Sequence, residues 1–147
     1  MFRGRFVHAI DSKGRLSMPA SYRAQLQETK DAPPILTNLQ DHLELYPHED
    51  WLEIEERLSQ AAASLQPEAQ DLQRFMVSGA VEAPIDGQGR ILVPPYLRQH
   101  AGLEREVAIA GVGRHVELWD RTRFDQHLAR TQARLNEIAS VVARSRL

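Results

Sequence analysis

The sequence IDSKGRLSMPASYR at residues 10–23 returns as IDGQGRILVPPYLR at residues 85–98. The two stretches align without a gap and are identical at six of their fourteen positions. A second match follows each stretch, because HLELY at residues 42–46 corresponds to HVELW at residues 115–119. The offset is 75 residues for the first match and 73 for the second, so a two-residue length difference lies between them. This pattern indicates an internal duplication, which governs how the rest of the chain is interpreted.

Each copy is expected to contain four short strands and a small helix. In both copies a strand runs into an Asp-x-x-Gly-Arg turn, where Asp can cap the turn and Gly can take a positive φ. A proline then stops the return strand and can open a short helix at its first position. The predicted strands are residues 6–10, 16–18, 35–36 and 43–46 in the first copy and 81–85, 91–93, 107–110 and 116–119 in the second, with helices at 20–26 and 95–101.

Helical patterns follow both copies and set the expected domain boundaries. Trp51, Ile54 and Leu58 recur at helical spacing, and Pro67 can begin a further helix. A copy of about 45 residues buries too little apolar surface to be stable alone. The two copies should therefore share a core, either by packing on one another or by exchanging strands. We expect a first domain at 5–52, a helical linker at 53–80, a second domain at 81–124 and a C-terminal helix at 125–147.

The composition is typical of a globular protein. The chain has 147 residues, 42% of them hydrophobic, and a net charge of −2. It contains no cysteine, which excludes disulfides, thiolate nucleophiles and Cys-based zinc sites. No run approaches the ~18 consecutive apolar residues of a membrane helix, and the N-terminus lacks the apolar core of a signal peptide. We therefore expect a cytoplasmic protein with no membrane contact.

The charges are segregated along the chain. Residues 1–30 carry a net charge of +4, residues 31–72 carry −9, and residues 73–147 carry +3. Sixteen of the 18 basic residues are arginine, the side chain suited to fork-like contacts with phosphate or guanine edges. Residues 1–23, with five basic residues and one acid, are the best candidate for contact with phosphate, because neutralising phosphates supplies most of the affinity of DNA-binding proteins.

These motifs together resemble the MraZ family. They comprise the Met-Phe-Arg-Gly start, the two Asp-x-x-Gly-Arg turns with their prolines, and a Gly-Val-Gly hairpin at 111–113 ahead of Val-Glu-Leu-Trp at 116–119. The resemblance covers essentially residues 1–125. It implies an α+β, mostly β fold, in which two tandem AbrB-like swapped-hairpin domains form a pseudo-dimeric small barrel with flanking helices.

The resemblance also implies a function. The family consists of bacterial transcriptional regulators that form ring-like homo-oligomers. They bind repeated double-stranded DNA boxes in the promoter upstream of the division and cell-wall gene cluster, normally their own operon. We therefore expect a sequence-specific DNA-binding protein of the nucleoid that uses no cofactor and no small-molecule substrate.

Basic residues in and beside the two turns are the candidate DNA contacts. We expect Lys13 and Arg15 to lie at the nucleic acid, with Arg3 and Arg5 in support on the same surface. Arg90 is the equivalent of Arg15 in the second copy, which is less basic because Gln88 replaces Lys13 and should bind DNA more weakly or not directly. For both Arg15 and Arg90, an ion pair with the turn aspartate is the alternative role.

Four further residues are expected to stabilise the turns rather than contact DNA. A carboxylate beside a phosphate is unfavourable, so Asp11 and Asp86 are assigned to turn capping and to the orientation of the nearby arginines. Gly14 and Gly89 are expected to take the positive φ that the turns require.

Other functions are disfavoured by particular absences. The six histidines show neither H-x-x-x-H nor H-E-x-x-H spacing, so we expect no catalytic residue and no metal site. His42 and His115, which match between the copies, are expected at hairpin edges. An oligomeric AbrB-like scaffold or an antitoxin-type module would keep the same fold. The antitoxin is disfavoured because its tail is flexible and acidic, whereas the C-terminal segment here is helical and carries arginine.

Overall fold

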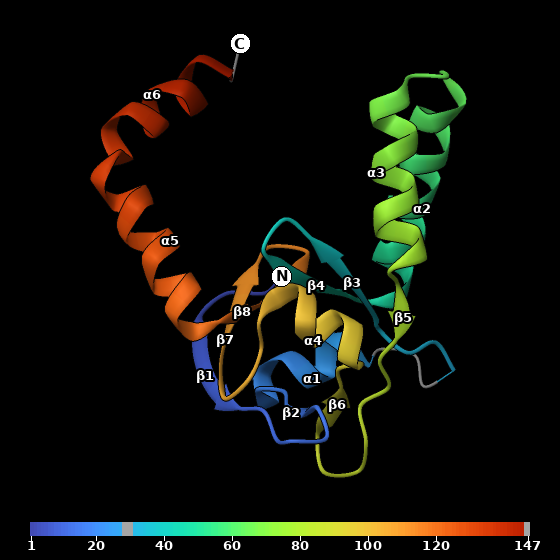
Figure 1. Ribbon diagram of the computed structural model, residues 1–147, viewed down its shortest axis with the longest axis vertical. Coiled ribbons are helices and arrows are strands. Elements are labelled where there is room, and N and C mark those ends of the chain that lie inside the picture. The colour runs from blue at the N-terminus through green and yellow to red at the C-terminus, as the bar shows by residue number, and fades with distance from the viewer. Residues whose placement is uncertain (28–30, 146–147) are drawn as a thin grey trace.

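The computed structural model describes residues 1–27 and 31–145, and Figure 1 shows its helices and strands. Each copy of the repeat has the order strand, strand, helix, strand, strand, helix, helix. The first copy comprises β1 (Arg5–Ala9), β2 (Arg15–Ser17), α1 (Ala20–Leu26), β3 (Ile35–Leu39), β4 (His42–Tyr46), α2 (His48–Ala63) and α3 (Pro67–Ser78). The second comprises β5 (Val81–Glu82), β6 (Arg90–Leu92), α4 (Pro95–Ala101), β7 (Glu106–Val112), β8 (His115–Asp120), α5 (Arg121–Ala133) and α6 (Leu135–Ser145).

The strands of the two copies are interleaved. Within the described residues, a six-stranded antiparallel sheet has the order β1-β7-β8-β4-β3-β5, and β2 pairs with β6 in a separate two-stranded ribbon. Strand β1 of the first copy pairs with β7 of the second, and β5 of the second pairs with β3 of the first. Of the two arrangements that the sequence left open, the chain therefore adopts the exchange of strands.

Reciprocal backbone hydrogen bonds relate the two copies by an approximate twofold axis. The N–H of Met18 donates to the carbonyl of Gly89 at 2.9 Å. The equivalent N–H of Val93 donates to the carbonyl of Gly14 at 2.8 Å. Each turn therefore meets the return strand of the other copy, so neither hairpin is complete without its counterpart.

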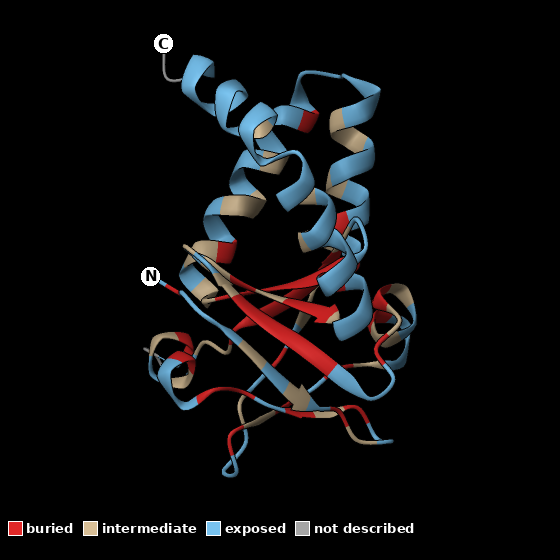
Figure 2. Cartoon of the chain, turned by 90° about the vertical axis from the view of Figure 1, so that its left-hand side faces the viewer, coloured by how far each residue is buried: buried red, intermediate tan, exposed pale blue. Residues whose placement is uncertain are grey.

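The main hydrophobic core is built by both copies together. Leu16 and Ile91 from the ribbon and Leu36 and Val107 from the large sheet belong to one cluster and are essentially inaccessible to solvent. Burying each such side chain contributes about 1.5–3 kcal/mol. Figure 2 shows this buried layer between the ribbon and the helices.

Two pairs of helices project from the side of the large sheet that faces away from the ribbon (Figure 1). Trp51 of α2 and Met76 of α3 form a second buried cluster with side chains of the sheet, and Phe124 of α5 packs with Trp119 in a third. The outer parts of the helices are largely exposed (Figure 2). Among the described residues, no helix combines the length and the apolar content needed to cross a bilayer.

Three features of the expected fold are wrong. Within the described residues the strands form two separate sheets and not a closed barrel, with β1 and β5 left at the edges of the large sheet. Strand β5 stops at Glu82, short of the predicted 81–85, because Pro84 has no N–H with which to continue the ladder. The helices also contain more residues than the strands, so the chain is α+β and not mostly β.

The C-terminal segment also differs from the single helix expected at 125–147. Helix α5 begins earlier, at Arg121, because the side chain of Asp120 caps it by accepting a hydrogen bond from the N–H of Arg123. It ends at Ala133, and α6 follows after Arg134, whose φ of −116° interrupts the helix. Residues 146–147 lie outside the described part of the chain.

Replacing Gly14 by alanine should destabilise the fold. Gly14 has a φ of +86°, and a Cβ atom there would lie 2.5 Å from the carbonyl oxygen of Val93. We expect Gly14→Ala to lower the free energy of unfolding, measured by urea denaturation, by about 1–3 kcal/mol. Gly87→Ala is the matched control, because a Cβ there meets nothing within 4 Å. An equal loss of stability in both variants would contradict this account of the turn.

Candidate nucleic-acid interface

The β2–β6 ribbon lies at the end of the molecule opposite the projecting helices (Figure 1). Successive side chains of a strand point to opposite faces. Leu16 and Ile91, which pair with one another, are buried in the core, so Arg15 and Arg90 point away from it. The outer face of the ribbon therefore carries one arginine from each copy. Leu92, which pairs with Arg15 across the ribbon, is 58% exposed.

The carboxylate of Asp11 closes the first turn. Its Oδ1 accepts hydrogen bonds from the backbone N–H of Arg15 at 2.9 Å and of Lys13 at 3.0 Å. Its Oδ2 accepts one from Nε of Arg15 at 2.7 Å. The Arg15 backbone N–H and then the Arg15 side chain favour the ionised carboxylate, and they lower the pKa of Asp11 from 3.8 to about 2.

The second turn repeats this arrangement more loosely. Oδ1 of Asp86 accepts from the N–H groups of Gln88 at 2.8 Å and Arg90 at 2.9 Å, but Nε of Arg90 lies 3.4 Å from Oδ2. The pKa of Asp86 is also lowered, first by the backbone N–H of Arg90. Gly89, with a φ of +79°, occupies the position that Gly14 has in the first turn.

Each turn is also covered by an arginine that follows the proline in the other copy. Nε of Arg98 donates to the carbonyl of Val93 at 3.0 Å, and its guanidinium lies against Gly14. Arg23 lies against Gly89 in the equivalent position. The sequence did contain a signal for these contacts, since this arginine is the last identical position of the fourteen-residue match. We did not predict that the two arginines cover the turns.

The expected basic surface is not continuous. Lys13 is exposed in the first turn, next to the ribbon. Arg5, by contrast, begins β1 opposite Ala110, and its guanidinium carbon lies 6.0 Å from the ring centre of Phe124 in α5. Arg5 therefore lies toward the helices, at the end of β1 away from the turn, and Arg3 precedes it. The structure does not bring these residues together with Lys13 and Arg15, because the five residues of β1 separate Arg5 from the turn.

The geometry of the ribbon suits contact with a groove in DNA. The major groove of B-DNA is about 12 Å wide and admits a two-stranded β-ribbon. Both turn aspartates are engaged by backbone N–H groups and by their arginines, so they do not present an unpaired negative charge. Within the described residues, the group of side chains that could hold a metal ion lies elsewhere, at His42, Glu44 and Glu117 of the large sheet.

Comparison with known proteins identifies similar chains. Residues 1–75 and 76–143 each match the family model described as "MraZ protein, putative antitoxin-like". The chain is 40% identical over 147 residues to a transcriptional regulator MraZ of Solidesulfovibrio magneticus, covering 99% of this chain and 96% of the relative. Proteins of the same name from Heliobacterium modesticaldum and Escherichia coli are 44% and 43% identical, covering 95% and 87% of this chain and 94% and 85% of those relatives.

The contacts of Asp11 predict a pH-dependent contribution to stability. Because its pKa is depressed in the folded state, ionised Asp11 stabilises the fold above the ordinary pKa of 3.8, and this stabilisation is lost as the pH falls through about 2. We expect Asp11→Asn to lower the urea midpoint at pH about 5 and to differ much less from the wild type at pH about 2.

Asp71→Asn provides the control, because Asp71 forms an exposed ion pair with Arg74 on α3. Such a pair contributes little to stability. A deficit in Asp11→Asn of the same size at both pH values would show that the carboxylate charge is not responsible.

Proposed function

This chain belongs to the MraZ family of transcriptional regulators, and we propose that it regulates transcription by recognising specific double-stranded DNA sequences. The observation that carries the proposal is the exposed β2–β6 ribbon with Arg15 and Arg90 on its outer face. Base pairs can be told apart by their edges in the major groove, which accepts an element of this shape. The family consists of regulators and not of enzymes, in agreement with the absence of a catalytic motif from the sequence.

Arg15 is the proposed base-reading residue. Its Nε is held by Asp11, and its terminal nitrogens make no hydrogen bond to another described residue. A guanidinium presented in this way can donate two parallel hydrogen bonds to O6 and N7 of guanine. Because the ion pair already restricts the side chain, less rotamer freedom is lost when DNA binds. Arg90 would make the same contact from the second copy, although its ion pair with Asp86 is longer than that of Arg15 with Asp11.

Phosphate contacts are proposed for the remaining basic residues. Lys13 is exposed beside Arg15, where an ammonium group can reach the DNA backbone. Gln88 takes the equivalent place in the second turn, so that turn should contribute less to affinity. Arg3 and Arg5 lie at the far end of β1, and we assign them only a supporting role at phosphates.

The regulator is proposed to act as a homo-oligomer, in a ring. The exchange of strands supports the proposal that the chain contains two AbrB-like swapped-hairpin domains. Exposed apolar side chains on the projecting helices, such as Leu72 and Phe75 on α3 and Val141 and Val142 on α6, are available for contacts between copies. Several ribbons facing repeated boxes would gain affinity through effective concentration.

The proposed target is the promoter upstream of the division and cell-wall gene cluster, including the gene for this chain. The regulator would then work in the cytoplasm at the nucleoid. Boxes separated by about one helical turn, ~10 bp, would present the same face of the DNA to successive subunits.

Substitution of Arg15 tests this function directly. Fluorescence anisotropy would compare the DNA upstream of the gene with a scrambled duplex of equal length at two salt concentrations. We expect Arg15→Ala to weaken binding to the upstream DNA by roughly 10–100-fold, as loss of a bidentate base contact does, and to change binding to the scrambled duplex far less.

Arg74→Ala is the matched control, since Arg74 lies on α3 and forms an exposed ion pair remote from the ribbon. Equal, weak binding of the wild type to both duplexes would overturn the proposal and favour a scaffold that does not read DNA. If Arg74→Ala alone lost the preference for the upstream DNA, the DNA-binding surface would lie on the helices instead of the ribbon.

The spacing of the boxes tests the proposed assembly. We expect affinity to rise steeply from one box to several boxes at ~10 bp intervals, and to fall when about 5 bp are inserted between them, because neighbouring boxes then face opposite sides of the helix. The measurement is a titration of the wild type against duplexes of equal length. Affinity that does not depend on the number or the spacing of boxes would contradict binding by an oligomer.

A further inference from the structure

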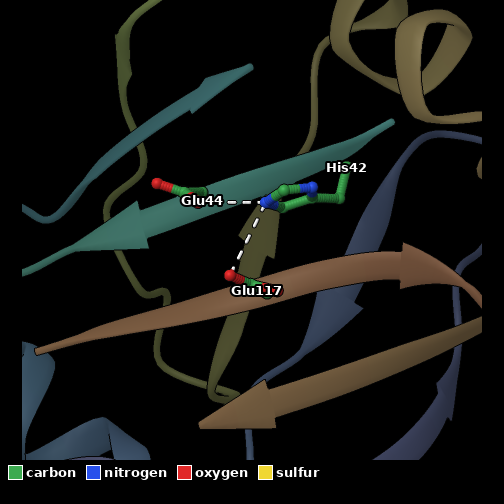
Figure 3. A group of neighbouring side chains, drawn as sticks. All are labelled: His42, Glu44 and Glu117. Atoms are coloured by element: carbon green, nitrogen blue, oxygen red, sulfur yellow. Dashed lines mark hydrogen bonds and ion pairs between the residues drawn. The ribbon is translucent and has the colours of Figure 1, made fainter. Parts of the chain in front are cut away.

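A buried cluster of histidine and glutamate lies at the centre of the large sheet (Figure 3). His42 and Glu44 come from β4, and His115 and Glu117 occupy the equivalent positions in β8. The two strands are adjacent, and Glu44 lies directly opposite Glu117 in their register. The histidines were expected at hairpin edges, but the pairing of β4 with β8 across the two copies places them in the two central strands of the sheet, where His42 is only 3% exposed.

The two carboxylates require positive charge between them. Like charges directly opposite one another on paired strands are destabilising. Glu44 and Glu117 also have side chains that are only 6% and 18% exposed, so water screens their repulsion poorly. Within the described residues, the basic side chains that contact them are the two histidines. Either imidazolium ions or one divalent cation would balance the charge.

The ligand atoms of His42, Glu44 and Glu117 converge, since they all lie within 4.8 Å of one another, and His115 borders this group. Nε2 of His42 lies 2.9 Å from Oε2 of Glu44 and 3.6 Å from Oε2 of Glu117. Nε2 of His115 lies 2.9 Å from Oε2 of Glu117 and 3.5 Å from Oε2 of Glu44. Ligands of a tetrahedral zinc ion with bonds of 2.0–2.2 Å are about 3.3 Å apart. The two separations from Nε2 of His42 bracket this value, and an ion pair with Glu44 alone would not need that nitrogen to face Glu117 as well.

The outer oxygens of the carboxylates are already occupied. The hydroxyl of Tyr46 donates to Oε1 of Glu44, and Nε1 of Trp119 donates to Oε1 of Glu117 at 2.9 Å. Such outer contacts orient metal ligands in known sites. They leave both Oε2 atoms facing the two Nε2 atoms. The rings are held as well, since that of His42 stacks on Trp119 with centres 4.6 Å apart.

We propose that His42, Glu44 and Glu117 form a zinc-binding site between the two copies. One imidazole and two carboxylate ligands match the preferences of zinc, and a water molecule would complete four-coordination. His115, which lies 2.9 Å from Glu117, would orient that ligand. The ion would neutralise the facing carboxylates and join β4 to β8. His115 and Glu117, about one-fifth exposed at their side chains, provide the route of entry.

The test uses the untagged full-length chain, treated with EDTA and then titrated with Zn²⁺ alone. We expect one zinc ion per chain and, at about 100 times the dissociation constant, a rise in the unfolding temperature of about 5–10 °C. Co²⁺ in place of Zn²⁺ should give the strong visible absorption of tetrahedral coordination. No zinc-dependent rise in the wild type would overturn the proposal and leave two imidazolium ions as the counter-charges.

Variants locate the ion. His115→Gln and Glu117→Gln lie at the more exposed side of the cluster, and circular dichroism would establish that each folds. We expect both to bind Zn²⁺ at least tenfold more weakly and to lose the rise in unfolding temperature. His8→Gln, on β1 and outside the cluster, is the control and should keep both. Unchanged zinc binding in a folded Glu117→Gln variant would place the ion elsewhere and refute this site.

Discussion

The pairing of β2 with β6 is the constraint on which the rest of the structure depends. Each of these strands has only three residues, and each pairs with its repeat counterpart instead of completing a sheet within its own copy. The pairing buries Leu16 against Ile91 and brings each Asp-x-x-Gly-Arg turn onto the return strand of the other copy. A copy too small to build a core alone thereby obtains one from its duplicate.

The same twofold relation produces two surfaces of different character. On one side of the core, the ribbon presents Arg15 and Arg90, each of which forms an ion pair with an aspartate four residues earlier. On the other side, β4 and β8 bring Glu44 and Glu117 face to face below the projecting helices. The first surface is open and suited to an extended anionic partner, and the second is buried and suited to a single small cation. A substitution that weakens the contact between the two copies should therefore affect both surfaces.

The duplicated pattern in the sequence predicted most of the local structure but not how the copies combine. Both short helices, at 20–26 and 95–101, occur as expected, because proline opens them and apolar residues anchor them. The barrel was wrong, and the structure does not bring the expected basic residues together, since both depend on where β1 and β5 run after the exchange. The cluster around His42 was missed because its residues are spaced for a strand, two residues apart, and come from two strands that pair only across the two copies.

The most direct test of the central claim, that the ribbon built by both copies enters the DNA groove, is site-specific photocrosslinking. A photoreactive amino acid would replace Leu92, which is exposed on the ribbon, or Leu72, which is exposed on α3. With the upstream DNA bound, we expect a crosslink to DNA from position 92 and none from position 72. A crosslink from position 72 with none from position 92 would contradict this claim.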